Sequence, residues 1–321
     1  MGTDFVANNP TYFQDLWTMD RGFLLLATGL PRWAPIPTLT RAHIARRRMI
    51  QACSVFHEAM EKKYNGQDPG PEWSSLDNVS NLIKARMLVY RKHNWSIEAR
   101  AACEVALLWA MNANANPLIF WMLNHIYSDA ALLAMLREEI APYVRVKQPG
   151  QDLPIPEAPR IEAIDQEGLV NNCPLLKSAY IETLRVDTAV WSFKIIRQDF
   201  VLQAREKEYK DVEKFLLKKG QEWRADRHVK HEEIETDGEK KAIAEMGTVR
   251  PFGGGQSMCK GRAFAQKEAL IYTAAVISMW DMEPAGGHGM WKMPRHKKAT
   301  GTYTTRDDVR VWIRRRNTPN E

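Results

Sequence analysis

The chain has 321 residues, 45% hydrophobic and 26% charged, so it is long and apolar enough to bury a large core. Its net charge of +6 is a small excess of 45 basic over 39 acidic residues, both interspersed along the chain, which argues against nucleic acid as a partner. The four cysteines lie far apart without a Cys-x-x-Cys pair, which excludes a zinc module and a dense disulfide framework.

The N-terminal residues lack the basic and apolar stretches of a signal peptide. The longest apolar run, residues 23–29, is too short to span a bilayer. We therefore expect a chain without a membrane anchor in a reducing compartment. Such a chain is cytoplasmic or is attached peripherally to a membrane through residues 23–30.

The first hundred residues predict helices that a proline-rich turn at residues 31–37 interrupts. Apolar residues at helical spacing predict a solvent-facing amphipathic helix over residues 41–63. A loop follows at residues 65–73, and a shorter helical pattern covers residues 76–93.

The long central helix predicted at about residues 96–127 is apolar around most of its circumference, which is typical of a helix in the middle of a large domain. Its centre holds Asn112, Asn114 and Asn116, followed by Pro117, and a proline at this place permits a kink. We expect one kinked, buried helix whose amides have partners. The alternative is a helix that breaks at Pro117 and exposes its asparagines.

The rest of the chain predicts helices over residues 130–144 and 173–185, joined by a proline-rich connector at residues 149–159. Short strands are expected within residues 186–201, and the charged, apolar-poor stretch 230–245 predicts a surface loop. No internal repeat or Gly/Ser linker divides the sequence. These elements predict a mainly α fold with a small β portion in a single domain, residues 1–321.

The most informative stretch is PFGGGQSMCKGR, residues 251–262, which precedes a predicted helix over residues 262–279. Glycines at this density allow positive φ and a close approach of the backbone to a bulky partner. Cys259 comes just before the helix N-terminus, where free N–H groups and the helix dipole stabilise a thiolate. An axial ligand of haem iron needs these properties; the alternative is an inert buried thiol.

Here the sequence resembles a known family. The stretch FGGGQSMCKGR is similar to the haem-binding loop of the cytochrome P450 family, F-x-x-G-x-x-x-C-x-G, and Phe252, Gly255, Cys259 and Gly261 match its fixed positions. The resemblance implies a haem-ligand loop over residues 251–262, with Cys259 as the axial ligand of the iron of haem b (iron protoporphyrin IX). It also implies that the other three residues shape the cofactor site.

Two further motifs occur in the family's order. The tetrapeptide ETLR, Glu182 to Arg185, resembles the E-x-x-R helix, and residues 222–228 resemble the arginine motif that follows it. Glutamate and arginine three positions apart share a helix face and can pair, although such a pair on the surface contributes little. The resemblance implies that Arg227 joins Glu182 and Arg185 in a structural ion network that supports the cysteine loop.

The details look most like fungal members near the prostacyclin-synthase and sterol 7-hydroxylase branch. The resemblance implies a haem-thiolate monooxygenase, an oxidoreductase that uses O2 to hydroxylate a hydrophobic small molecule in secondary-metabolite biosynthesis. It further implies a monomer that receives electrons from an NADPH-dependent reductase. Four basic residues are candidate reductase contacts: Arg250, Lys260, Arg262 and Lys267.

The sequence departs from the family in the loop and in the central helix. Many relatives have a basic residue two positions before the cysteine, where this chain has Ser257. The family's acid–alcohol pair on the distal helix is replaced by Ala113 and Asn114, neither of which titrates at neutral pH. We expect Asn114 on the distal side, where an amide can orient bound water. An electron-independent isomerase or dehydratase is therefore an alternative function.

The third departure is length. Family members have several helices before the turn at residues 31–37, and the interval from Arg185 to Arg227 is shorter than theirs. The sequence therefore predicts an incomplete, N-terminally truncated form of the fold. Full-length eukaryotic relatives are anchored to the endoplasmic reticulum membrane by an N-terminal helix. A third alternative is a truncated product that binds haem poorly and does not turn over.

Overall fold

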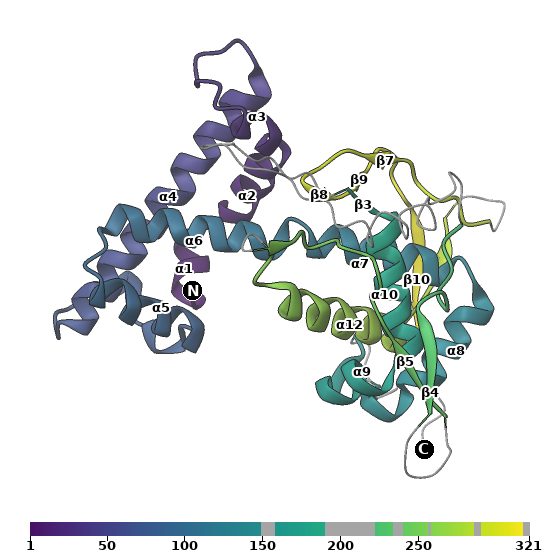
Figure 1. Ribbon diagram of the computed structural model, residues 1–321. Helices are drawn as coiled ribbons and strands as arrows, with labels where there is room; N and C mark the ends of the chain where they lie inside the picture. Colours follow the sequence, from purple (N-terminus) through teal and green to yellow (C-terminus); the bar gives the residue numbers. More distant parts are fainter. Residues whose placement is uncertain (149–157, 190–221, 234–239, 256–257, 286–289, 317–321) are drawn as a thin grey trace. The chain divides into compact units, whose positions relative to one another are not determined.

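The computed structural model describes residues 1–148, 158–189, 222–233, 240–255, 258–285 and 290–316 (Figure 1). The chain divides into two compact units, Met1–Asn114 and Ala115–Glu321, and each is described by itself. The single domain expected from the sequence stays a prediction.

The first unit is built of helices around one apolar core. The long helix α4 (Pro37–Tyr64) begins with a proline in its first turn, where a missing N–H costs nothing. It packs against α2 and α6 and buries Met49 and Phe56 fully. The other elements are α1 (Thr3–Asn8), α2 (Tyr12–Arg21), α3 (Phe23–Ala27), η1 (Pro71–Trp73), η2 (Leu76–Asn78), α5 (Asn81–Lys92) and α6 (Ile97–Asn112). The helix expected over residues 41–63 is confirmed as part of α4.

The long helix expected over residues 96–127 is divided. The helix α6 ends at Asn112, two turn residues follow, and α7 (Ala115–Tyr127) begins the second unit. Pro117 lies in the first turn of α7, and a proline ring inside a helix clashes with the carbonyl four residues earlier, here that of Ala113. Asn116 is exposed, whereas the side chain of Asn112 donates to the carbonyl oxygen of Leu108 at 2.8 Å. The described residues thus show an interruption at residues 113 and 114, with Asn116 but not Asn112 or Asn114 exposed, and the choice between the two interpretations stays a prediction.

The second unit is centred on α12 (Arg262–Met279), which contacts α7, α8, α9 and α10 (Figure 1). Its inner face buries Leu270, Ala274 and Ile277 completely. The remaining helices are α8 (Ala130–Ile140), η3 (Ala141–Tyr143), α9 (Gln166–Asn172) and α10 (Pro174–Val186). The helices expected over residues 130–144, 173–185 and 262–279 are confirmed, with the first ending at Ile140.

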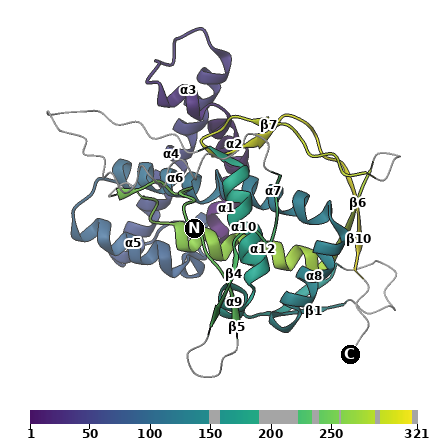
Figure 2. The same ribbon diagram turned by 45° about the vertical axis from the view of Figure 1, so that its right-hand side comes forward.

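The β portion of the described residues consists of antiparallel pairs of short strands. These pairs are β1 (Val144–Lys147) with β2 (Arg160–Ile164), β3 (Thr188–Ala189) with β8 (Gly301–Thr302), β4 (Val229–Glu233) with β5 (Lys240–Ala244), β6 (Trp280–Pro284) with β10 (Val311–Arg315), and β7 (His296–Lys297) with β9 (Thr304–Thr305). Figure 2 shows β6 and β10 side by side. The mainly α fold with a small β portion is confirmed.

The prediction of a surface loop over residues 230–245 is wrong, because β4 and β5 pair there as antiparallel strands. The strands are charged because much of their surface faces solvent: Lys230 pairs with Glu245 at 2.7 Å across the hairpin, and both side chains are exposed. Among the residues of the two strands whose burial is described, Ala244 at the end of β5 is the buried one. Of the strands expected within residues 186–201, the described residues include β3. Residues 190–201, and residues 149–157 of the predicted connector, lie outside the described part.

No single helix among the described residues is long and apolar enough to cross a membrane, and one bent pair, 97–127 with 130–143, passes only by length and composition. The first unit exposes three large apolar side chains at and after α3. Leu24 is 50% exposed, Leu30 39% and Trp33 84%.

Candidate functional site

The cysteine loop, residues 251–262 in the second unit, follows the segment after β5, which ends at Ala244, and leads into α12. The amide of Cys259 donates to the carbonyl oxygen of Phe252 at 3.0 Å, which closes the loop, and the amide of Met258 donates to Gly255 at 3.2 Å. Phe252 packs against the core of the unit, so the loop is fixed at its base. Gly253 and Gly255 have φ of +73° and +62°, values that other residues rarely adopt.

The side chain of Cys259 is exposed, so the alternative of a buried inert thiol is not what the structure shows. A Cβ atom added at Gly253, Gly254 or Gly255 would meet nothing within 4 Å. An accessible thiol beside open backbone suits a flat macrocycle whose iron takes a cysteine thiolate as its protein ligand. The residues of this loop therefore fit the haem that the sequence predicts.

Gly261 and the residue at position 257 complete the loop. Gly261 precedes α12 with φ of −82°, and a Cβ there would lie 3.8 Å from the Sγ of Cys259, an ordinary contact. Its expected role at the cofactor stays a prediction. Gln256 and Ser257 lie outside the described residues.

The ion network expected from the sequence is assembled around Glu182, whose side chain is fully buried in α10. Arg185 donates from Nε and from a terminal nitrogen to the two carboxylate oxygens, both at 2.7 Å. Arg227 donates from Nε to Oε1 at 2.7 Å, and the amide of Arg224 donates to the same oxygen at 3.1 Å. The three side chains named from the sequence thus come together.

Burial alone would raise the pKa of Glu182, but the hydrogen bonds from Arg185, His228, Arg227 and the Arg224 amide outweigh it and lower that pKa well below its usual value. The hydrogen bonds between Arg185 and Glu182 raise the pKa of Arg185, although the burial of Arg185 acts to lower it. The carboxylate is therefore held ionised, with cations on both sides of it.

The sequence did not indicate His228, whose Nε2 lies 3.0 Å from Oε2 of Glu182. Its backbone amide donates to the Ser178 hydroxyl at 3.0 Å, and nearby the indole of Trp223 donates to Thr183 at 3.2 Å. These bonds join residues 222–228 to α10 along one face. The sequence signal for His228 was its place next to Arg227 in the motif. That place does not predict that the imidazole ring contacts Glu182.

A second missed cluster lies at the end of α10. Asp187 is 1% exposed, and its two carboxylate oxygens contact Nε2 of His125 at 2.9 Å and Nε2 of His296 at 2.7 Å. The ring of His125 stacks on Trp223 with centroids 4.5 Å apart. Side chains from α7 and β7 therefore meet on the carboxylate of the residue that directly follows α10.

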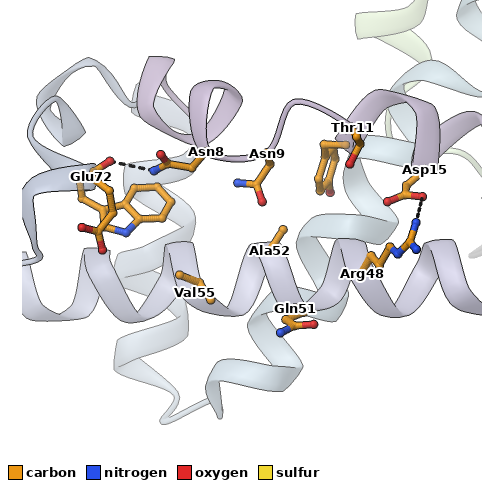
Figure 3. A pocket seen from close by; sticks show the side chains of 11 residues that line it. Asn8, Asn9, Thr11, Asp15, Arg48, Gln51, Ala52, Val55 and Glu72 are labelled. Carbon is orange, nitrogen blue, oxygen red and sulfur yellow. Dashed lines mark hydrogen bonds and ion pairs between the residues drawn. The ribbon is translucent and has the colours of Figure 1, made fainter.

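Asn114 is the last residue of the first unit, half-buried in the turn between α6 and α7, and Ala113 beside it is buried. Its expected place on the distal side of a haem stays a prediction. A pocket of about 380 Å³ in the same unit lies between α2, α4 and η1 (Figure 3). Figure 3 shows Asp15 paired with Arg48, at 3.6 Å, and no site residue expected from the sequence lines this pocket.

No protein-family model matches the chain. The chain is 27% identical over 300 residues to the cytochrome P450 monooxygenase calL of Penicillium decumbens, which covers 88% of this chain and 52% of that protein. A cytochrome P450 monooxygenase of Gibberella zeae is 25% identical over 303 residues, with shares of 89% and 52%. Cholesterol 7-alpha-monooxygenase of Cricetulus griseus is 26% identical over 303 residues, with shares of 88% and 54%.

The mainly α fold is consistent with the resemblance, and these matches confirm it: the chain is similar to cytochrome P450 monooxygenases over most of its length. More particularly, it is similar to fungal members and to mammalian sterol 7-hydroxylases. The chain spans about half the length of the curated relatives that it matches. These relatives are named as monooxygenases.

Proposed function

We propose that the chain acts as a haem-thiolate monooxygenase that hydroxylates a hydrophobic small molecule, with Cys259 as axial ligand of haem b. The observation that supports this most strongly is the exposed thiol of Cys259 on a closed loop with open backbone at three glycines. A thiolate-ligated haem, when bound, supplies O2 activation and C–H oxidation. The substrate class in this proposal is a secondary metabolite, as the resemblance to fungal members implies.

The chain's own residues supply binding and orientation. The link from the Cys259 amide to Phe252 holds the thiol at a fixed place, and the glycines leave room for the ring. The Glu182 network ties α10 to residues 222–228 and stabilises the unit that carries the loop. In this proposal Phe252, Gly255 and Gly261 contact the cofactor, and Glu182, Arg185 and Arg227 act only as structural support.

The reduced carbon monoxide difference spectrum tests the proposal. We expect the spectrum typical of thiolate ligation in the chain loaded with haem, and its loss in Cys259→Ala. The matched control is Cys103→Ala, which removes a half-buried thiol in α6 and leaves the loop intact. Haem bound without the thiolate spectrum, or a spectrum that survives Cys259→Ala, would reject Cys259 as the ligand. Failure to retain any haem would favour the alternative of a product without turnover.

The isomerase or dehydratase alternative is favoured by one observation, the absence of a titratable side chain at Ala113 and Asn114. A monooxygenase consumes NADPH when reductase and substrate are both added, whereas an isomerase or dehydratase consumes none. Asn114→Asp restores a proton donor at this place. If Asn114 lies on the distal side, that variant changes the pH dependence of NADPH consumption, while Asn116→Asp, which alters an exposed residue, does not.

The partner and location follow from the same proposal. An NADPH-dependent reductase docks on the face that carries the cysteine loop, with Lys260, Arg262 and Lys267 among its contacts, and the chain acts as a monomer. Lys267→Glu weakens the affinity for the reductase if this docking is correct. The exposed Leu24, Leu30 and Trp33 support peripheral attachment to the endoplasmic reticulum membrane. Recovery of the chain in the soluble fraction after lysis without detergent would instead place it in the cytoplasm.

A further inference from the structure

A cleft of about 700 Å³ lies next to the cysteine loop within the second unit. Its wall is formed by the end of α10, the start of β4 and residues 245–251, which lead directly into the loop. The cleft therefore borders both the Glu182 network and the backbone that positions Cys259.

The basic groups that line the cleft outnumber the carboxylates that pair with them. Arg185 and Arg227 share the single carboxylate of Glu182, and Lys230 pairs with Glu245 at 2.7 Å. Arg250 is exposed, and within the described residues its guanidinium bonds only to the carbonyl oxygens of Gly247, at 2.5 Å, and Val249, at 3.2 Å. A cleft with this excess of positive charge attracts an anion.

Arg250 is also tied to the cysteine loop. Its carbonyl oxygen accepts from the Gly253 amide at 3.3 Å, and Phe252, two residues further on, accepts from the amide of Cys259 at 3.0 Å. The guanidinium and the thiol thus project from one short, closed stretch of backbone. On the cleft side, a Cβ at Gly247 would meet nothing within 4 Å, so the space beside Arg250 is open.

We propose that Arg250 binds a propionate carboxylate of the haem that Cys259 ligates, an inference that rests on the proposed function. Haem b has two propionate carboxylates at one edge of its ring, and an arginine fork matches a carboxylate with two parallel hydrogen bonds. The groups that now receive the Arg250 hydrogen bonds are backbone carbonyls, which are neutral. A carboxylate is a stronger acceptor for the same guanidinium.

The test compares haem with haem dimethyl ester, whose carboxylates are esterified and uncharged, on the full chain. The readout is the rate at which each bound porphyrin transfers to a haem-scavenging acceptor protein. We expect the wild-type chain to release haem about tenfold more slowly than its ester, the size typical of a charged hydrogen bond. Arg250→Gln should release both at similar rates, and Arg250→Lys should keep part of the difference. The difference should shrink as salt is raised.

The control is Arg306→Gln, which removes another exposed arginine of the second unit that does not line the cleft. It should release haem and ester as the wild type does. If Arg250→Gln keeps the full discrimination while its carbon monoxide spectrum shows thiolate ligation, this inference is wrong and the proposed function stands. If the wild-type chain shows no thiolate spectrum, the proposed function is wrong, and the inference that rests on it falls with it. Inorganic phosphate that binds Arg250 in the haem-loaded chain without speeding haem transfer would mean a free anion site and would overturn the propionate assignment.

Discussion

Arg227 and Glu182 are 45 positions apart in sequence, and Nε of the arginine lies 2.7 Å from Oε1 of the glutamate. Arg185 and His228 contact the same carboxylate, so one buried charge is satisfied by side chains from two separate segments. Removal of that charge would leave two guanidinium groups without their anion. Removal of any one member of this ion cluster should therefore destabilise the fold, because a buried charge without its partner is costly.

Glu182→Gln should lower the free energy of unfolding by about 3 kcal/mol, the size expected when a buried ion pair loses one member. The control is Glu245→Gln, which breaks the exposed pair with Lys230 and should change stability by less than about 0.5 kcal/mol. Urea-induced unfolding followed by circular dichroism measures both variants. An equal decrease in the free energy of unfolding in the two variants would show that the buried ion pairs of Glu182 are no stronger than a surface pair.

The stabilisation from Glu182 should depend on pH in a defined window. The pKa of Glu182 is lowered in the folded chain, since its hydrogen bonds to Arg185, His228, Arg227 and Arg224 outweigh the opposite effect of burial. In the unfolded chain it titrates near the ordinary value of about 4.3. A lowered folded-state pKa means that the stability contribution is present above about pH 4 and is lost as pH falls toward the folded pKa. The stability difference between wild type and Glu182→Gln should therefore narrow below about pH 4, and a difference that widens there would contradict the sign.

Gly255→Ala should disturb the cysteine loop, because φ of +62° strains an alanine by about 1 kcal/mol. The matched control is Gly254→Ala, next to it, where φ is not positive and the added Cβ also meets nothing within 4 Å. Exchange of the Cys259 amide hydrogen, which is bonded to Phe252, reports the opening of the loop. We expect it to be roughly fivefold faster in Gly255→Ala alone, and equal exchange in both variants would argue against strain as the cause.

Three of the four thiols should differ strongly in reactivity. Burial raises the pKa of Cys53 to about 12 and that of Cys173 to about 12, with Glu104 and Glu139 adding to the respective shifts. Cys259 is exposed. In native buffer near neutral pH, a maleimide should label Cys259 first and should reach Cys53 and Cys173 only when the chain unfolds. Mass spectrometry of labelled peptides gives the order, and haem loading should slow the labelling of Cys259.

Asp187→Asn should loosen the segment that includes β7 and β8. The substitution removes a carboxylate that contacts His125 and His296, and charge-assisted bonds of this kind contribute about 2 kcal/mol. The amide of Tyr303, which donates to the Asp187 carbonyl at 2.8 Å, should exchange its hydrogen faster as a result. Asp308→Asn, at an exposed position, is the control. Unchanged exchange at Tyr303 would show that the two imidazoles do not hold this segment.

The helices were predicted well where their sequence signals are local. Residues 262–279 form α12 with the expected ends, because Gly261 and the apolar run mark them. The hairpin of β4 and β5 was missed because its exposed faces carry charges that hide the alternation of a strand. The central helix was expected to continue past Pro117. The structure shows two turn residues between the end of α6 at Asn112 and the start of α7 at Ala115, a position that the sequence did not predict.

The site shows the same division between local and long-range information. Glu182 and Arg185 share a helix turn, and Arg227 was named by its motif, so sequence could identify all three. His228 and Asp187 could not be found in this way, because their contacts depend on how β4, α7 and β7 pack against α10. Contacts between residues more than about 40 positions apart are set by the tertiary packing of the unit.

The hydrogen bond from the Cys259 amide to Phe252 has a consequence for how the loop can vary. A backbone bond is indifferent to the identity of the side chains between its ends. Among the described residues, the place of the thiol therefore depends on the positive φ of Gly253 and Gly255 and on the packing of Phe252. Substitution of Met258, whose side chain takes no part in the Cys259–Phe252 bond, should keep the cysteine in position and so change the neighbour of the ligand alone.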